Sequence, residues 1–223
     1  MLLTIVIVTI AMALIFDVFN GANDAANSIA TVVSTRVLSP SMAVLWAAFF
    51  NFVAMFVFAP RVADTISKLV IIDASDPAFV YVVLAGLMGA AGWLFLATWK
   101  GLPISASHSL IGGLVGSGIA HRGVEVIRWE KVFITIKYIP LAPLMGMTLS
   151  FFIMVGMFWL FRNFRPMAVD QLFRRGQLVS AALFSLGHGG NDAQKTMGVI
   201  VALLVAAGYF KPDVHLSLLD PKT

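Results

Sequence analysis

Three long runs of the chain are free of charged residues, and each is long enough to cross a membrane. They lie at residues 40–60, 78–99 and 138–161. A spanning helix needs about 20 mostly apolar residues, so each run predicts one membrane segment. Pro140 and Pro143 stand at the start of the third run, where we expect them to kink the helix.

Three further apolar runs are interrupted by polar residues. The run at 2–16 ends at Asp17, the run at 104–120 is rich in serine and glycine, and the run at 177–210 contains GHGGNDAQK. Interrupted apolar segments in corresponding positions are typical of transporters that bind their cargo on broken helices. The pattern therefore predicts an all-α polytopic membrane protein with about six membrane segments, two of them broken at the polar motifs.

A short polar motif occurs twice. The sequence GANDA at 21–25 recurs as GGNDA at 189–193, an offset of 168 residues, and both copies interrupt apolar runs. At the same offset, Asn27 aligns with Lys195. Many transporters consist of inverted repeats with the binding site at the repeat interface. We expect residues 1–161 to form the first repeat, 162–176 a basic cytoplasmic loop, and 177–223 the start of the second repeat.

A serine-rich segment, GLPISASHSLIGG, starts at Gly101, which is 80 residues after Gly21. If the repeat is regular, a counterpart should start about the same distance after Gly189, beyond Thr223. The second repeat is thus expected to be incomplete, with this chain as the front part of a longer protein.

Composition agrees with a lipid environment. The chain is 60% hydrophobic and 12% charged, whereas a soluble domain carries about 25% charged residues. The net charge of +4 comes from short basic clusters between the apolar runs. Such clusters are typical of cytoplasmic loops rather than of a nucleic-acid surface, so we expect a multi-pass protein of the inner membrane and no nucleic-acid partner. Cysteine is absent, which excludes disulfide and thiolate chemistry.

The polar motifs offer the groups that bind an oxyanion such as phosphate. Unwound helix ends supply free backbone N–H groups and a positive dipole end. Amides, hydroxyls, imidazoles and one ammonium add donors and positive charge. The candidate anion ligands on these grounds are Asn23, Ser105, Ser107, His108, Ser109, Asn191 and Lys195.

Asp24 and Asp192 cannot bind an anion directly, and a carboxylate inside the membrane costs roughly 2.5–3.5 kcal/mol. We expect them to hold a coupling cation, either H⁺ or Na⁺, or a divalent metal that travels with phosphate. Proton coupling would require an acidic or imidazole group that titrates near neutral pH. No resident metal centre and no cofactor are predicted.

Structural roles for the same residues stay open. Each Asp could cap the helix that follows it. Lys195 could instead form a salt bridge with Asp192 three residues earlier, and His108 or His188 could be packing residues. Asp17 could belong to the site or anchor the helix at the interface, while Asn51 is more typical of hydrogen bonding between helices.

At these residues the chain resembles the inorganic phosphate transporter (Pit) family. The resemblance lies in GANDAANSIATVVSTRVLSP, GLPISASHSLIGG and SLGHGGNDAQKTMGVI, and spans about residues 11–210. It implies a phosphate symporter with an inverted repeat that works by alternating access. Carried over to this chain, the family's motifs nominate Asn23, Asp24, Asn27, Ser105, Ser107, His108, Ser109, Asn191 and Asp192.

One departure from the doubled motif bears on the coupling ion. The second copy continues with Gln194 and Lys195 instead of a second Asn, which resembles the proton-coupled bacterial type. An ammonium group would also disfavour a sodium ion at that position because two cations repel.

Several alternatives remain open. Within the family they are a sodium-coupled phosphate symporter and a sulfate permease. Outside it they are a non-transporting membrane scaffold and an intramembrane hydrolase, although the chain has neither HExxH nor GxSxG. The expected partners are inorganic phosphate and membrane lipid, and a homodimer stays open.

Overall fold

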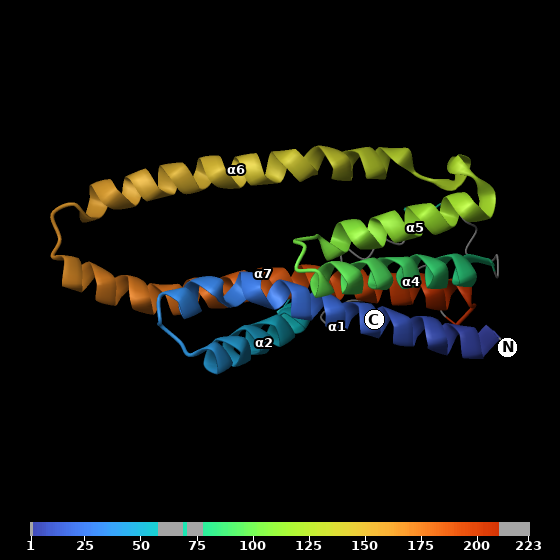
Figure 1. Ribbon diagram of the computed structural model, residues 1–223, viewed down its shortest axis with the longest axis horizontal. Helices are drawn as coiled ribbons and strands as arrows, with labels where there is room; N and C mark the ends of the chain where they lie inside the picture. The colour runs from blue at the N-terminus through green and yellow to red at the C-terminus, as the bar shows by residue number, and fades with distance from the viewer. Residues whose placement is uncertain (1, 58–68, 71–77, 210–223) are drawn as a thin grey trace, which may run out of the picture.

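The computed structural model describes residues 2–57, 69–70 and 78–209 and is nearly all helical (Figure 1). The helices in chain order are α1 (Leu2–Ser34), α2 (Pro40–Val57), α4 (Ala78–Trp99), α5 (Ala106–Arg122), α6 (Trp129–Phe161) and α7 (Pro166–Ala206), with a 3₁₀ turn at Val124–Val126. In the described part of the chain the β structure is one isolated bridge between Val70 and Ile127. The predicted all-α class is confirmed.

Four of these helices, α1, α2, α4 and α6, are long and apolar enough to cross a membrane. Helix α4 coincides with the predicted span 78–99, and α2 with the described part of the predicted span 40–60, whose last three residues lie outside the described residues. Helix α6 begins at Trp129 rather than at residue 138 and continues through Pro140 and Pro143. The described residues form six helices, four of which are long and apolar enough for a span, so the count is roughly consistent with the six segments expected.

The two predicted breaks at the polar motifs are absent, which corrects that part of the prediction. Helices α1 and α7 run without interruption through Gly21, Gly189 and Gly190. At Gly189 the missing side chain serves close packing instead, because a Cβ there would lie 2.6 Å from the Cα of Asn51 on α2. An unbroken helix also keeps its backbone hydrogen bonds satisfied inside a bilayer, which offers no alternative partners.

The serine-rich segment does contain an interruption. Helix α4 ends at Trp99, and Gly101 takes a left-handed conformation with φ +66°. Ser105 then caps α5, and its hydroxyl oxygen accepts a hydrogen bond from the backbone N–H of His108 at 3.4 Å. The predicted run at 104–120 therefore begins as a loop and continues as a helix of 17 residues.

Most of the predicted basic loop at 162–176 is helical. Pro166 occupies the first turn of α7, a position where its missing N–H costs no hydrogen bond. Arg174 Nε donates to Asp170 Oδ2 at 2.8 Å, one helical turn away. Only Arg162–Arg165 remains as the connection between α6 and α7, and its cytoplasmic location stays a prediction.

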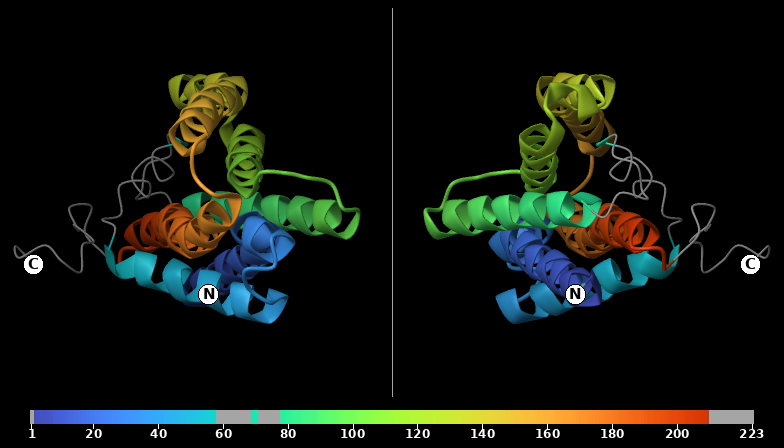
Figure 2. Two further views of the ribbon diagram at one scale, coloured as in Figure 1. Left: turned by 90° about the vertical axis from the view of Figure 1, so that its left-hand side faces the viewer. Right: turned by 90° about the vertical axis from the view of Figure 1, so that its right-hand side faces the viewer.

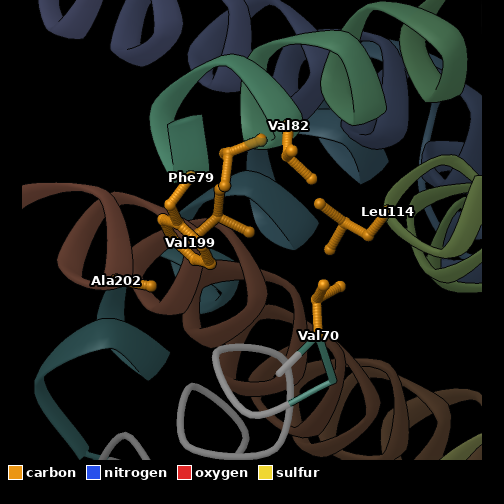
Figure 3. A pocket seen from close by; sticks show the side chains of 7 residues that line it. Val70, Phe79, Val82, Leu114, Val199 and Ala202 are labelled. Carbon is orange, nitrogen blue, oxygen red and sulfur yellow. The ribbon is translucent and has the colours of Figure 1, made fainter. Parts of the chain in front are cut away.

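Helix α1 packs against α2, α4 and α7, and α5 packs on α4. Figure 2 shows α5 between α4 and α6, and α6 meets α7 at its C-terminal end, where the ring centroids of Phe161 and Phe173 are 5.3 Å apart. Most apolar side chains of α6 are exposed, which suits contact with lipid. Where α4, α5 and α7 meet, an apolar pocket of about 20 Å³ has room for roughly one water (Figure 3). That pocket is too small and too apolar for an oxyanion.

The contact between α4 and α5 depends on glycine at one position. A Cβ at Gly113 would overlap the backbone carbonyl oxygen of Gly86 on α4. By contrast, a Cβ at Gly112 or Gly116 would meet no atom within 4 Å. The GxxxG spacing of Gly112 and Gly116 is therefore not what brings these two helices together.

We predict that Gly113→Ala lowers the thermal unfolding midpoint of the detergent-solubilised protein, because the added methyl group must push α5 away from α4. Overpacking of this kind typically costs about 1–3 kcal/mol. Gly112→Ala is the matched control on the same helix, and we expect it to leave the midpoint unchanged or raise it, since alanine favours a helix by about 1 kcal/mol over glycine. Equal effects of the two substitutions would contradict this account of the interface.

Candidate functional site

Helices α1 and α7 lie side by side in opposite directions. The hydroxyl of Thr196 on α7 donates a hydrogen bond to Asp17 on α1. Further along α1, Asp24 approaches His188, and Thr35, just beyond the end of α1, donates to Gln177. Each step forward along α1 thus matches a step backward along α7. In this register the level of Ala22 along α1 corresponds to the level of Gly190 along α7, the same two positions that the repeat equates.

The centres of the two motif copies therefore lie at about the same level of the antiparallel helix pair. Two antiparallel copies related by a local two-fold axis would produce this arrangement. It is compatible with the predicted inverted repeat, which stays a prediction for the chain as a whole.

A cavity of about 450 Å³ lies where α1, α2 and α7 meet. Its walls are apolar where α2 contributes Val44, Ala47 and Phe52. Ligand sites commonly combine apolar walls with a few polar groups in volumes of about 300–1,000 Å³. The polar and charged residues that line it are Asp17, Asn20, Asp24, Ser28, Asn51, His188 and Asp192.

His188 stands between the two motif carboxylates. Its Nε2 lies 3.1 Å from Asp192 Oδ2 and 3.8 Å from Asp24 Oδ2. One possible ligand atom from each of the three residues lies within 4.8 Å of the others. Two carboxylates and an imidazole at this spacing match the donors that divalent metals accept in proteins.

Each motif carboxylate also has a partner three residues further along its own helix. Asn27 Nδ2 donates to Asp24 Oδ1 at 3.2 Å, and Lys195 Nζ donates to Asp192 Oδ1 at 2.6 Å. The salt bridge between Lys195 and Asp192 that sequence analysis left open is therefore present. Because Asp192 is held by a full positive charge and Asp24 by a neutral amide, the two copies differ in charge.

Several polar atoms at this junction lack a hydrogen-bond partner among the described residues. They are Asn20 Oδ1, Ser28 Oγ, Asn51 Oδ1 and, on the neighbouring turn of α7, Ser185 Oγ. A buried polar group without a partner costs about 1–3 kcal/mol, so such atoms are expected to bind a ligand, an ion or water. Three of the four line the cavity.

Asn20 and Ser28 were not singled out from the sequence, although a signal was available. Asn20, Asp24 and Ser28 are spaced four residues apart, which places them on one face of a continuous helix. His188, Asp192 and Thr196 repeat this spacing on α7. The expectation of broken helices obscured the pattern, because a break would separate the faces.

Other predicted ligands lie outside the cavity lining. Asn23 is turned by about 100° from Asp24 around α1 and donates to Thr98 of α4 at 3.0 Å. Asn191 is exposed on α7. Four more, Ser105, Ser107, His108 and Ser109, lie in the first turn of α5 or just before it. Their predicted role in binding phosphate remains a prediction.

Comparison with known proteins gives consistent matches. The model of the phosphate transporter family matches residues 20–218. A protein of Rhizobium meliloti (strain 1021) named "Probable low-affinity inorganic phosphate transporter" is 49% identical over 209 residues, covering 93% of this chain and 61% of that protein. A protein of the same name from Bacillus subtilis (strain 168) is 37% identical over the whole chain and 65% of its own length. The chain thus spans less than two thirds of these relatives.

A solved structure titled "The sodium-dependent phosphate transporter" shares the fold. The TM-score is 0.87 at 24% sequence identity, over 96% of this chain and 71% of that one. The family match and the four helices of spanning length make the chain a multi-pass membrane protein, as predicted, and in a bacterium such a protein lies in the inner membrane. With the family model matched over most of its length and both motifs in place, the chain belongs to the phosphate transporter family.

Proposed function

We propose that this chain forms the cargo-binding part of a symporter that carries inorganic phosphate across the membrane together with protons. The observation that carries the proposal is the meeting of both copies of the motif in one polar cavity between α7 and two helices of spanning length, α1 and α2. Buried carboxylates are costly in a membrane and are tolerated where they line a path for solute or ions. Family membership supports transport rather than enzymatic catalysis.

The charges in the cavity support coupled binding of an anion and a cation. Asp17, Asp24 and Asp192 make the lining acidic, while Lys195 supplies one opposing charge to Asp192. Phosphate entering alone would meet net repulsion, which is strong in a medium of low dielectric constant. A cation that binds at Asp24 would reduce this repulsion, so each solute favours the binding of the other.

A divalent metal is a second way to deliver that positive charge. Asp24, His188 and Asp192 offer suitable ligand atoms within 4.8 Å. A divalent cation bound to a phosphate dianion has no net charge, which lowers the cost of entry into the membrane. We therefore include a neutral metal–phosphate complex as cargo of the same site.

We predict that Asp24→Asn and Asp192→Asn each reduce phosphate uptake by the full-length protein about tenfold or more. Loss of a charged hydrogen-bonding partner is worth about 1.5–3 kcal/mol, and each 1.4 kcal/mol is tenfold. The measurement is initial uptake of radiolabelled phosphate in cells that lack other phosphate carriers. Asp170→Asn is the matched control, because Asp170 is exposed at the start of α7. Unchanged uptake in both motif variants would favour a scaffold.

A second prediction concerns the coupling ion. Replacing sodium by choline at fixed pH should leave phosphate uptake unchanged, whereas a protonophore should abolish accumulation. Lys195 already supplies a positive charge to Asp192, so the proposal needs a free cation at Asp24 alone, and there the proposed coupling ion is the proton. Loss of uptake in choline medium would establish sodium coupling instead.

A competition experiment distinguishes phosphate from sulfate as the transported anion. Phosphate at neutral pH still carries a proton that an Asp carboxylate can accept in a hydrogen bond, while sulfate has acceptor oxygens only. With three carboxylates lining the cavity, we expect excess sulfate to leave phosphate uptake unchanged. Sulfate uptake that persists in excess phosphate would identify a sulfate permease.

A further inference from the structure

We propose that the ammonium group of Lys195 occupies the cation site at Asp192, in the α7 copy of the motif, and keeps free monovalent cations from binding there. The mobile coupling cation then binds only at Asp24, in the α1 copy. The proposal rests on the proposed function and concerns the number of cations that accompany phosphate. It assigns Lys195 the role of a specificity-determining residue at Asp192 rather than that of a phosphate ligand.

The first argument is that the two copies differ systematically in charge. At the repeat offset, Asp17 corresponds to Ser185, Asn20 to His188, and Asn27 to Lys195. Each of these differences removes a negative group from α7 or adds a basic group to it. The Asp of the motif itself is kept in both copies, so the cation-binding group is retained while its surroundings become more positive.

The second argument is the geometry at the two carboxylates. Both oxygens of Asp192 have basic neighbours, Lys195 Nζ at 2.6 Å from Oδ1 and His188 Nε2 at 3.1 Å from Oδ2. At Asp24, the neutral amide of Asn27 donates to Oδ1 at 3.2 Å, and His188 lies 3.8 Å from Oδ2. Asp24 therefore has no charged group within hydrogen-bond distance among the described residues.

The third argument is that the pair is largely removed from solvent. The side chains of Lys195 and Asp192 are 16% and 14% exposed. Screening by water is weak at such positions, so the attraction between the two groups exceeds that of a surface pair. Because Lys195 is one turn away on the same helix, its ammonium group competes with any free cation as a tethered ligand whose local concentration does not depend on the medium.

The test is Lys195→Asn in the full-length protein, which gives α7 the residue that α1 has at the equivalent position. Without the ammonium group, Asp192 should accept a free cation in addition to the one at Asp24, and in sodium chloride that added cation can be sodium. We expect the purified variant to gain sodium-dependent thermal stabilisation when sodium chloride replaces choline chloride, because a ligand that binds the folded state raises its stability. In cells, its phosphate uptake should become severalfold dependent on sodium.

Two control variants separate this effect from a general loss of charge. Lys195→Arg keeps a positive charge beside Asp192 and should retain the sodium response of the parent protein. Lys137→Asn makes the same chemical change at an exposed position on α6 and should also leave that response unaltered. A sodium response in Lys137→Asn as large as in Lys195→Asn would overturn the assignment.

The outcomes for the proposal and for the proposed function are distinct. A parent protein that does not take up phosphate contradicts the function, whatever Lys195 does. A parent protein that takes up phosphate, together with a Lys195→Asn variant that shows no added sodium stabilisation, overturns the inference alone. If Lys195→Asn does not accumulate in the membrane, Lys195→Gln replaces it, with the same expectation. Failure of both neutral variants to accumulate would assign Lys195 to the fold and likewise overturn the inference.

Discussion

The organisation of the polar centre follows from one constraint: a carboxylate inside a membrane protein needs compensation by a nearby group. Asp24 and Asp192 lie within the long helices α1 and α7, and their side chains are only 18% and 14% exposed, so water supplies little of that compensation. The neighbours one turn away, Asn27 and Lys195, provide part of it, and His188 stands between the two acids. Because the partner of Asp24 is the neutral amide of Asn27, the negative charge of Asp24 remains available to bind a cation.

A second constraint is that the backbone inside the bilayer must keep its hydrogen bonds. The motif glycines therefore do not unwind the helices. At Gly189 the absent side chain lets α2 approach until its backbone would meet a Cβ atom. This close approach brings Asn51 into the lining of the cavity. The site is consequently built from side chains on three intact helices, rather than from free backbone N–H groups at helix ends.

The sequence alone was sufficient for the class of protein, for most spans, and for the pairing of the two motifs. The span at 78–99 is matched by α4 residue for residue, because charge-free runs of this length have few alternatives. The orientation of single side chains was not predictable, since it depends on which neighbouring helix packs where. Asn23 and Asp24 are adjacent in the sequence, yet Asn23 contacts α4 whereas Asp24 faces α7. The place of Asn20 and Ser28 in the cavity lining follows only from a continuous α1, which puts both on the same face as Asp24.

Under the proposed function, the same arrangement favours the joint binding of an anion and a cation. An empty cavity with three carboxylates and one ammonium group in its immediate surroundings is acidic, so it repels phosphate and attracts cations. A bound cation reverses part of that field, and a bound anion strengthens the hold on the cation, since linkage between two ligands is reciprocal. The strength of this linkage depends on weak screening, which the apolar face of α2 provides through Val44, Ala47 and Phe52. The apolar walls are thus as necessary to this linkage as the charged residues, because the charges would interact only weakly in water.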